Sequence, residues 1–154
     1  MELDTEKARR LLVGINGSIH SNEGGMINKE YNLACDVGNL VDACHGAAVR
    51  SGWWTDINTG ESTLGKRNMG EMLCLVHSEI SEAMEAHRKG LMDDKLPTRS
   101  GLEVELADAI IRITDLAGAY KLDLGGAIVE KLRYNAQRAD HKIENRKAPG
   151  GKAY

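Results

Sequence analysis

The chain has 154 residues, of which 42% are hydrophobic and 28% are charged, and its formal net charge is −3. These values are typical of one globular domain and exclude an intrinsically disordered chain, which combines low hydrophobicity with high net charge. A domain that binds duplex nucleic acid usually has a basic excess, and no apolar run approaches the roughly 18 residues of a membrane span. We therefore expect neither a nucleic acid polymer nor a membrane as a partner.

The N-terminus and the cysteines indicate the cellular setting. The first residues are not basic and lead into no apolar segment, so no secretory signal is predicted. The three cysteines, Cys35, Cys44 and Cys74, are odd in number and show no C-x-x-C pattern. This argues against a disulfide framework and against a zinc site, and favours a reduced, cytoplasmic setting.

Three regions follow one another along the chain. Residues 1–25 contain four glycines that interrupt any long element, and we treat this region as an N-terminal extension. Residues 26–146 carry the periodic apolar pattern of helices and form the predicted domain. Residues 147–154 form a C-terminal tail that contains glycine and lysine.

The first predicted helix runs from about Asn28, its N-cap, to Ser51. Its apolar residues recur with the 3.6-residue period of a helix at Leu33, Val37, Leu40, Val41, Cys44 and Ala48. After a loop, the second helix covers about 66–89, and Gly90 ends it. The residues predicted to point inward from this helix are Met69, Leu73, Val76, Ile80 and Ala83.

The third predicted helix opens with a capping box formed by Ser100 and Glu103 and continues to about Tyr120. Its predicted inward residues are Leu102, Leu106, Ile110, Ile113 and Ala117. The fourth helix follows a short turn, continues to about Asn145 and carries the apolar residues Ile128, Leu132, Ala136, Ala139 and Ile143. No segment alternates with period 2, so the sequence predicts an all-α fold, and four main helices with short connections indicate a four-helix bundle.

Two glutamates lie where the second helix should be apolar. On a helical wheel, Glu79 falls inside the apolar stripe and Glu82 falls at its edge. Burial of a carboxylate is costly unless the group is paired, hydrogen-bonded or bound to a cation. The i, i+3 spacing of these two residues puts both carboxylates within reach of one ion.

The third helix repeats this spacing with Glu105 and Asp108. Taken alone, the polar arc of Asp108, Arg112 and Asp115 fits a helix face that points to water. The combination of two acidic pairs on adjacent helices favours a hard-cation site for Mg²⁺, with Mn²⁺ as a substitute, because every donor is an oxygen. A ferritin-like di-iron site would need Glu-x-x-His motifs, and none occurs.

Polar and aromatic residues elsewhere are candidates for binding a nucleotide. The predicted fourth helix carries one polar stripe at Lys131, Asn135, Arg138 and Lys142. Such a stripe can hold a polyphosphate and a sugar, and a solvated basic face is the alternative of equal weight. For Trp53 and Trp54, the sequence is consistent with stacking on a nucleobase and with hydrophobic closure of the bundle end.

The two acidic pairs together form the pattern E-x-x-E, 22 residues, E-x-x-D. This pattern resembles that of the all-α nucleoside triphosphate pyrophosphohydrolases of the MazG family. Residues 70–90 and 103–128 look like the second and third helices of that family. Residues 131–138 are similar to its K-x-x-x-N-x-x-R segment, and the tripeptide Gly-Trp-Trp at 52–54 is similar to the end of its first helix. The resemblance covers roughly residues 28–152.

This resemblance implies hydrolysis of a nucleoside triphosphate to a monophosphate and pyrophosphate with Mg²⁺, as in the removal of unwanted nucleotides. It assigns metal binding and catalysis to Glu79, Glu82, Glu105 and Asp108. It assigns phosphate and sugar binding to Lys131, Asn135 and Arg138, and base binding to Trp53 or Trp54. It also implies a homodimer or homotetramer, in which the core of the bundle is partly intermolecular.

Two other functions are consistent with the same residues. One is a non-catalytic helical module that binds nucleotide with Mg²⁺ and does not turn it over. The other is a structural helical bundle that binds neither metal nor nucleotide. Metal-dependent release of pyrophosphate distinguishes the enzyme from both.

Overall fold

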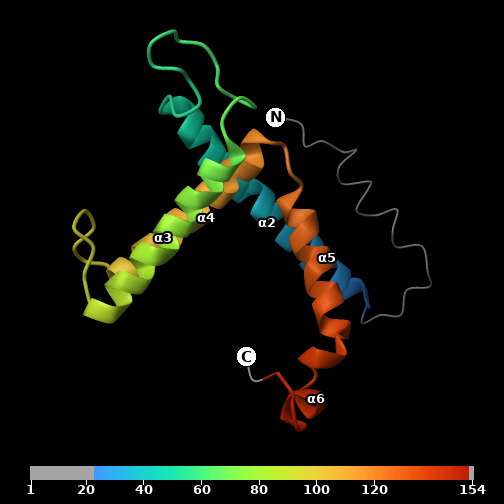
Figure 1. Ribbon diagram of the computed structural model, residues 1–154. Coiled ribbons are helices and arrows are strands. Elements are labelled where there is room, and N and C mark those ends of the chain that lie inside the picture. The colour runs from blue at the N-terminus through green and yellow to red at the C-terminus, as the bar shows by residue number, and fades with distance from the viewer. Residues whose placement is uncertain (1–22, 153–154) are drawn as a thin grey trace. The chain divides into compact units, whose positions relative to one another are not determined.

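The structure is a computed structural model that describes residues 23–152 (Figure 1). These residues form helices α2 to α6 and one 3₁₀ turn, η1, with no strand among them, which confirms the all-α class. Of the predicted N-terminal extension, residues 1–22 lie outside the described part of the chain. Within the described residues, no helix has both the length and the apolar character that a membrane crossing requires.

Helix α2 spans Glu23–Arg50 and begins earlier than predicted. Gly24 and Gly25 lie inside the helix, although the sequence indicated a break there, and Asn28 is an internal residue rather than the N-cap. Each glycine costs a helix only about 1 kcal/mol relative to alanine, which a helix of 28 residues can offset. The predicted stop is confirmed, because α2 ends before Gly52, which adopts a φ of 79°.

The chain divides into two compact units. One unit comprises residues 39–122, which include the C-terminal part of α2 and the whole of α3 and α4. The other comprises, among the described residues, 23–38 and 123–152. Helix α2 therefore contributes residues to both units.

Helices α3 (Met69–Lys89) and α4 (Gly101–Ala119) lie side by side in the 39–122 unit (Figure 1). The side chain of Asn68 caps the start of α3, and Gly90 ends the helix in the left-handed conformation, at φ 63°. Ser100 caps α4 by accepting a hydrogen bond from the backbone N–H of Glu103. The predicted stop at Gly90 and the predicted cap at Ser100 are thus confirmed.

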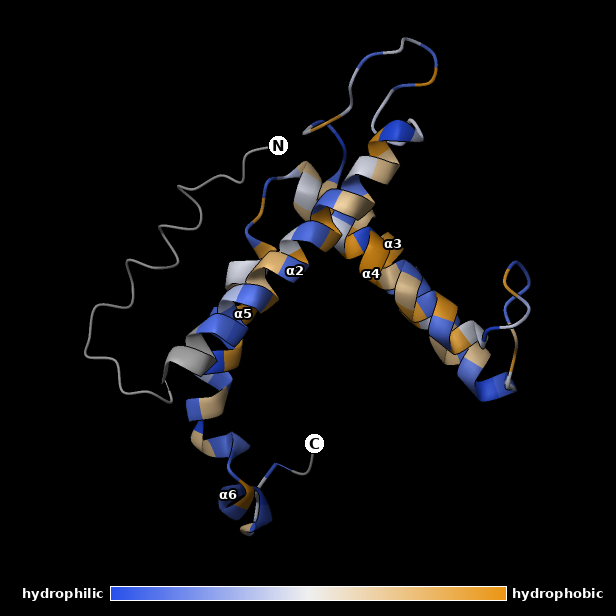
Figure 2. Ribbon diagram, turned by 180° about the vertical axis from the view of Figure 1, so that it is seen from behind, coloured by the Kyte–Doolittle hydropathy of each residue, from blue (hydrophilic) through white to orange (hydrophobic). Residues whose placement is uncertain are grey.

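Small residues bring α3 and α4 close together. Ala83, Ala86 and Ala109 are buried, and a Cβ built on Gly101 would lie 2.9 Å from the Cβ of Ala86. Several large aliphatic residues of both helices remain exposed. Figure 2 shows hydrophobic residues as orange stretches along α3 and α4. Within the single chain, five residues predicted to point inward are instead 40–49% exposed: Leu73, Ile80, Leu106, Ile110 and Ile113.

The hydrophobic core of this unit is built around Trp54, which is 2% exposed and packs with Met72 and Leu116. The indole Nε1 of Trp54 donates a hydrogen bond of 2.8 Å to Oδ1 of Asp115. Nδ1 of His45 also lies 2.8 Å from that oxygen. One carboxylate on α4 thus joins α2 and the loop after it to α4.

In the other unit, α5 (Leu124–Gln137) packs against the N-terminal part of α2. The contact is close because a Cβ on Gly125 would lie 2.5 Å from the carbonyl oxygen of Ala34. Arg133 adds a bidentate ion pair with Glu30, with N–O distances of 2.9 and 2.6 Å. Helices α2 and α5 are therefore joined both by a close backbone contact and by an ion pair.

The predicted fourth helix does not continue to Asn145. Helix α5 ends at Gln137, and Arg138 is extended, with φ −66° and ψ 130°. The turn η1 (Ala139–His141) and the short helix α6 (Ile143–Lys147) follow. Arg138 makes a bidentate pair with Asp140 two residues later, a contact that a continuous helix does not offer because residues i and i+2 do not face each other.

Candidate functional site

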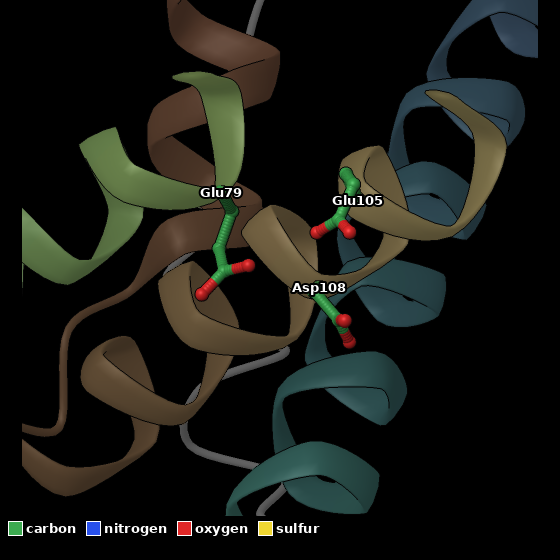
Figure 3. Close-up of side chains that lie close together, drawn as sticks. All are labelled: Glu79, Glu105 and Asp108. Carbon is green, nitrogen blue, oxygen red and sulfur yellow. The ribbon is translucent and has the colours of Figure 1, made fainter. Parts of the chain in front are cut away.

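Three of the four predicted carboxylates meet between α3 and α4. One oxygen from each of Glu79, Glu105 and Asp108 lies within 4.8 Å of the other two. Figure 3 shows Glu79 of α3 facing the two residues of α4. Glu82 is exposed and is not part of this group, which we call the carboxylate group.

The local structure explains why these side chains converge. Glu105 and Asp108 lie one helical turn apart on α4, so they extend from the same side of the helix. Glu79 lies on the side of α3 that packs against α4 and is 5% exposed. The burial predicted for Glu79 from the apolar periodicity of its helix is therefore confirmed.

Arg112 pairs with the buried glutamate. Its Nε donates to Oε1 of Glu79 at 2.5 Å, across the contact between α4 and α3. The sequence placed Arg112 on an arc that fits a water-facing surface, and its side chain is 43% exposed. The sequence did not predict that Arg112 and Asp115 also bond across elements. The signal that could have identified Arg112 is its i+4 spacing from Asp108, which puts both on one side of the helix.

The carboxylate group carries an excess of negative charge. Burial raises the pKa of Glu105, and so do the charge of Glu82 and a hydrogen bond with Glu79. Burial and the charge of Glu79 likewise raise the pKa of Asp108, whereas Arg112 opposes that rise. A further cation at this place would offset the repulsion that these shifts reflect.

The donor set fits a hard divalent cation. Every donor in the carboxylate group is a carboxylate oxygen, which suits Mg²⁺ and Mn²⁺ better than the softer metals that prefer thiolate or imidazole. The guanidinium of Arg112 already places one positive charge against Glu79. Glu79, Glu105 and Asp108 could thus hold a hard divalent cation through carboxylate oxygens.

A cavity of about 550 Å³ lies beside Asp108 within the 39–122 unit. Trp53, Arg67, Arg112 and Asp115 contribute to its wall. The rest of the wall is mostly apolar and consists of Ala43, Cys44, Ala47, Ala48, Ser51, Met72, Leu75 and Ile111. Its volume falls within the range of small-molecule sites, which measure roughly 300–1,000 Å³.

The two tryptophans have different environments. Trp53 is 69% exposed and lines the cavity. Trp54 is buried in the core, and the guanidinium of Arg67 lies 5.5 Å from its ring centroid. The burial of Trp54 matches hydrophobic closure of the helix end, so of the two only Trp53 offers an open ring for stacking.

The predicted phosphate- and sugar-binding residues belong to the other unit. Lys131 and Asn135 lie on α5, and Arg138 follows its end. Lys131 Nζ lies 4.9 Å from the ring centroid of Tyr134, and Arg138 is paired with Asp140. The Oδ1 of Asn135 is buried and accepts no hydrogen bond from the described residues, so a donor from outside them would satisfy it.

No protein-family model matches this chain, and no curated protein or solved structure matches it. A functional interpretation therefore depends on the site residues themselves and on the motif spacing that resembles the MazG family.

Proposed function

We propose that this protein is a metal-dependent nucleoside triphosphate pyrophosphohydrolase of the MazG type. Water attacks the triphosphate, one P–O–P bridge breaks, and the products are a nucleoside monophosphate and pyrophosphate. The observation that carries this proposal is the convergence of Glu79, Glu105 and Asp108 on one point between two helices. Removal of unwanted nucleotides from the cellular pool is a role that this reaction serves.

The carboxylates divide into two roles in this proposal. Glu79, Glu105 and Asp108 would hold Mg²⁺ or Mn²⁺, which when bound would supply positive charge against the triphosphate and lower the pKa of a nearby water. Glu82 lies outside the carboxylate group, yet its charge raises the pKa of Glu105, so it lies nearby. We assign to Glu82 the orientation of the attacking water and the acceptance of its proton.

The cavity beside Asp108 is our proposed site for the nucleoside. Trp53 would stack on the base, because its ring is exposed and lines the cavity. The MazG resemblance assigns phosphate binding to Lys131 and Arg138 and sugar binding to Asn135, whose buried Oδ1 lacks a donor among the described residues.

We also propose that the protein is a homodimer or a homotetramer. Leu73 and Ile80 on α3, and Leu106, Ile110 and Ile113 on α4, repeat at helical spacing and are exposed. Rows of exposed aliphatic residues are typical of protein–protein contacts. A second copy of the chain would bury the stripes that the sequence predicts to be internal.

Ile110→Lys is expected to convert the oligomer into a monomer, because a lysine at this position would be buried without a partner in the interface. Light scattering coupled to size-exclusion chromatography measures the mass. Ile57→Lys is the control, because Ile57 is 94% exposed in the loop between α2 and α3. A wild-type chain that elutes as a monomer at micromolar concentration would contradict the proposal.

The enzymatic proposal is tested by pyrophosphate release from a panel of standard and modified nucleoside triphosphates, with Mg²⁺, Mn²⁺ or EDTA. We expect release with one or a few bases, and EDTA should abolish it. Glu79→Gln should lower turnover by about 10³-fold or more, since it removes one charged ligand from the metal.

Glu71→Gln is the matched control, because Glu71 is an exposed glutamate on the same helix, in its first turn. It should retain turnover within about twofold of the wild type. Nucleotide binding with Mg²⁺ but without pyrophosphate release would identify the non-catalytic module. Absence of both metal and nucleotide binding would identify a structural bundle.

A further inference from the structure

We propose that Arg112 is an oxyanion-binding residue of this site. Glu79 holds the guanidinium through Nε, and the two Nη groups take phosphoryl oxygens of the substrate. The identity of the anion as a triphosphate rests on the proposed function. The anion site itself is inferred from contacts and burial around α3 and α4.

The hydrogen bonding of Arg112 leaves part of its guanidinium unused. Nε donates to Oε1 of Glu79 at 2.5 Å, and within the described residues neither Nη group donates a hydrogen bond. A guanidinium is planar, so a bond at Nε restricts the direction in which the two Nη groups can donate. Because Glu79 holds Nε, the two Nη groups of Arg112 form a fixed pair of donors, which suits two oxygens of one phosphoryl group.

The position of Arg112 is suitable for a ligand. Its side chain is 43% exposed, in contrast to the buried side chain of Glu79, so an anion can reach it from solvent. Arg112 and Asp108 both line the cavity beside the carboxylate group. An anion bound by Arg112 would thus lie next to the oxygens that are proposed to hold the metal.

Electrostatics also favours this role. Glu79, Glu105 and Asp108 place three carboxylates where a highly charged triphosphate must approach. A divalent cation offsets part of this repulsion, and a guanidinium next to it offsets more while fixing the orientation of the phosphoryl group. If Arg112 served only as a counter-ion for Glu79, its loss would lower stability without a specific effect on anion affinity.

The test is calorimetric titration of the full chain with inorganic tripolyphosphate, once in EDTA and once with Mn²⁺. Arg112→Gln should weaken tripolyphosphate binding about tenfold or more in both conditions, because charge-assisted hydrogen bonds are lost. Arg112→Lys keeps the charge without the planar pair of donors, so its affinity should lie between those of Arg112→Gln and the wild type. Mn²⁺ titrated alone should bind Arg112→Gln at least as tightly as it binds the wild type.

Arg99→Gln is the matched control, since it removes the same charge from an exposed i, i+4 pair with Glu103 next to the start of α4. Its tripolyphosphate affinity should stay within about twofold of the wild type. An equal loss in Arg99→Gln would overturn the inference, because bulk charge would then explain the effect. Tripolyphosphate affinity in a folded Arg112→Gln protein that matches the wild type would also overturn it.

The outcomes separate this inference from the proposed function. If the wild type releases pyrophosphate and Arg112→Gln binds tripolyphosphate normally, only the role of Arg112 fails. If tripolyphosphate binds through Arg112 while the wild type neither binds Mn²⁺ nor releases pyrophosphate, the hydrolase proposal fails and the anion site stands. If the wild type binds no tripolyphosphate at millimolar concentration, the anion site fails, and pyrophosphate release alone decides the hydrolase proposal.

Discussion

Replacing Glu105 with glutamine is expected to abolish pyrophosphate release and, in EDTA, to raise the thermal midpoint of unfolding. The pKa of Glu105 is raised, first by burial and then by the charge of Glu82 and the hydrogen bond with Glu79. A carboxyl with a raised pKa in the folded state costs stability while it is ionised, so at pH 7.5 a neutral amide should stabilise the metal-free fold. We expect a rise of about 1–3 °C in calorimetry, together with a loss of turnover of about 10³-fold or more.

Glu103→Gln is the control for this experiment. Glu103 lies two residues away on α4, is exposed and pairs with Arg99. Its replacement should leave turnover intact and should not raise the midpoint, because it relieves no repulsion. A lower midpoint for Glu105→Gln in EDTA would show that Glu105 stabilises the metal-free fold, contrary to this prediction. Saturating Mg²⁺ should raise the midpoint of the wild type and not that of Glu105→Gln.

If the carboxylate group binds a divalent cation as proposed, acidification is expected to release it at a higher pH than ordinary carboxyl groups would require. The pKa values of Glu105 and Asp108 are raised from ordinary values of 4.5 and 3.8, mainly by burial. Below these raised values, each protonated carboxyl must lose its proton before it can bind the cation, so Mn²⁺ affinity should fall about tenfold per pH unit for each proton displaced. Calorimetric titration of Mn²⁺ from pH 8 down to pH 4 measures this slope.

The metal-free protein should respond to pH in the opposite direction. Because the folded state binds these protons more tightly than the unfolded state does, the contribution of Glu105 and Asp108 to stability increases as the pH falls from neutral towards their ordinary pKa values. In Asp108→Asn, the stability change between pH 7.5 and pH 5 should be smaller than in the wild type. A Mn²⁺ affinity that stays constant down to pH 4.5, the ordinary pKa of a glutamate, would contradict the raised pKa values.

Local sequence signals predicted the helices of the 39–122 unit well. Ser100 and Gly90 were identified as the cap of α4 and the end of α3 because each signal depends only on neighbouring backbone groups. The break at Arg138 was not predicted, since the apolar period continues through it and nothing in that pattern shows the pairing of Arg138 with Asp140. Periodicity likewise predicted apolar stripes without showing that Ala83 and Ala109 would form the contact in place of Ile80 and Ile110.

The sequence predicted those features of the candidate site that show in the residue pattern of a single helix. Glu79 could be identified because a carboxylate interrupts an apolar stripe, and its burial is confirmed. Glu82, one helical turn after Glu79, lies at the edge of that stripe and outside the carboxylate group. Which of the two glutamates meets Glu105 and Asp108 depends on how α4 packs against α3, and the sequence of α3 alone does not show this. The bonds of Arg112 to Glu79 and of Asp115 to Trp54 join elements far apart in the chain, and a wheel drawn for α4 alone does not show them.

The contrast between the two adjacent tryptophans has an optical consequence. The chain has no other tryptophan, so its ultraviolet emission combines one exposed indole with one buried indole. Acrylamide in solution can collide with Trp53, whereas the core around Met72 and Leu116 shields Trp54. A ligand in the cavity should therefore protect the red-shifted emission of Trp53 from quenching by acrylamide. Unfolding should shift the blue emission of Trp54. Emission spectra recorded with acrylamide thus report cavity occupancy and core integrity as separate signals.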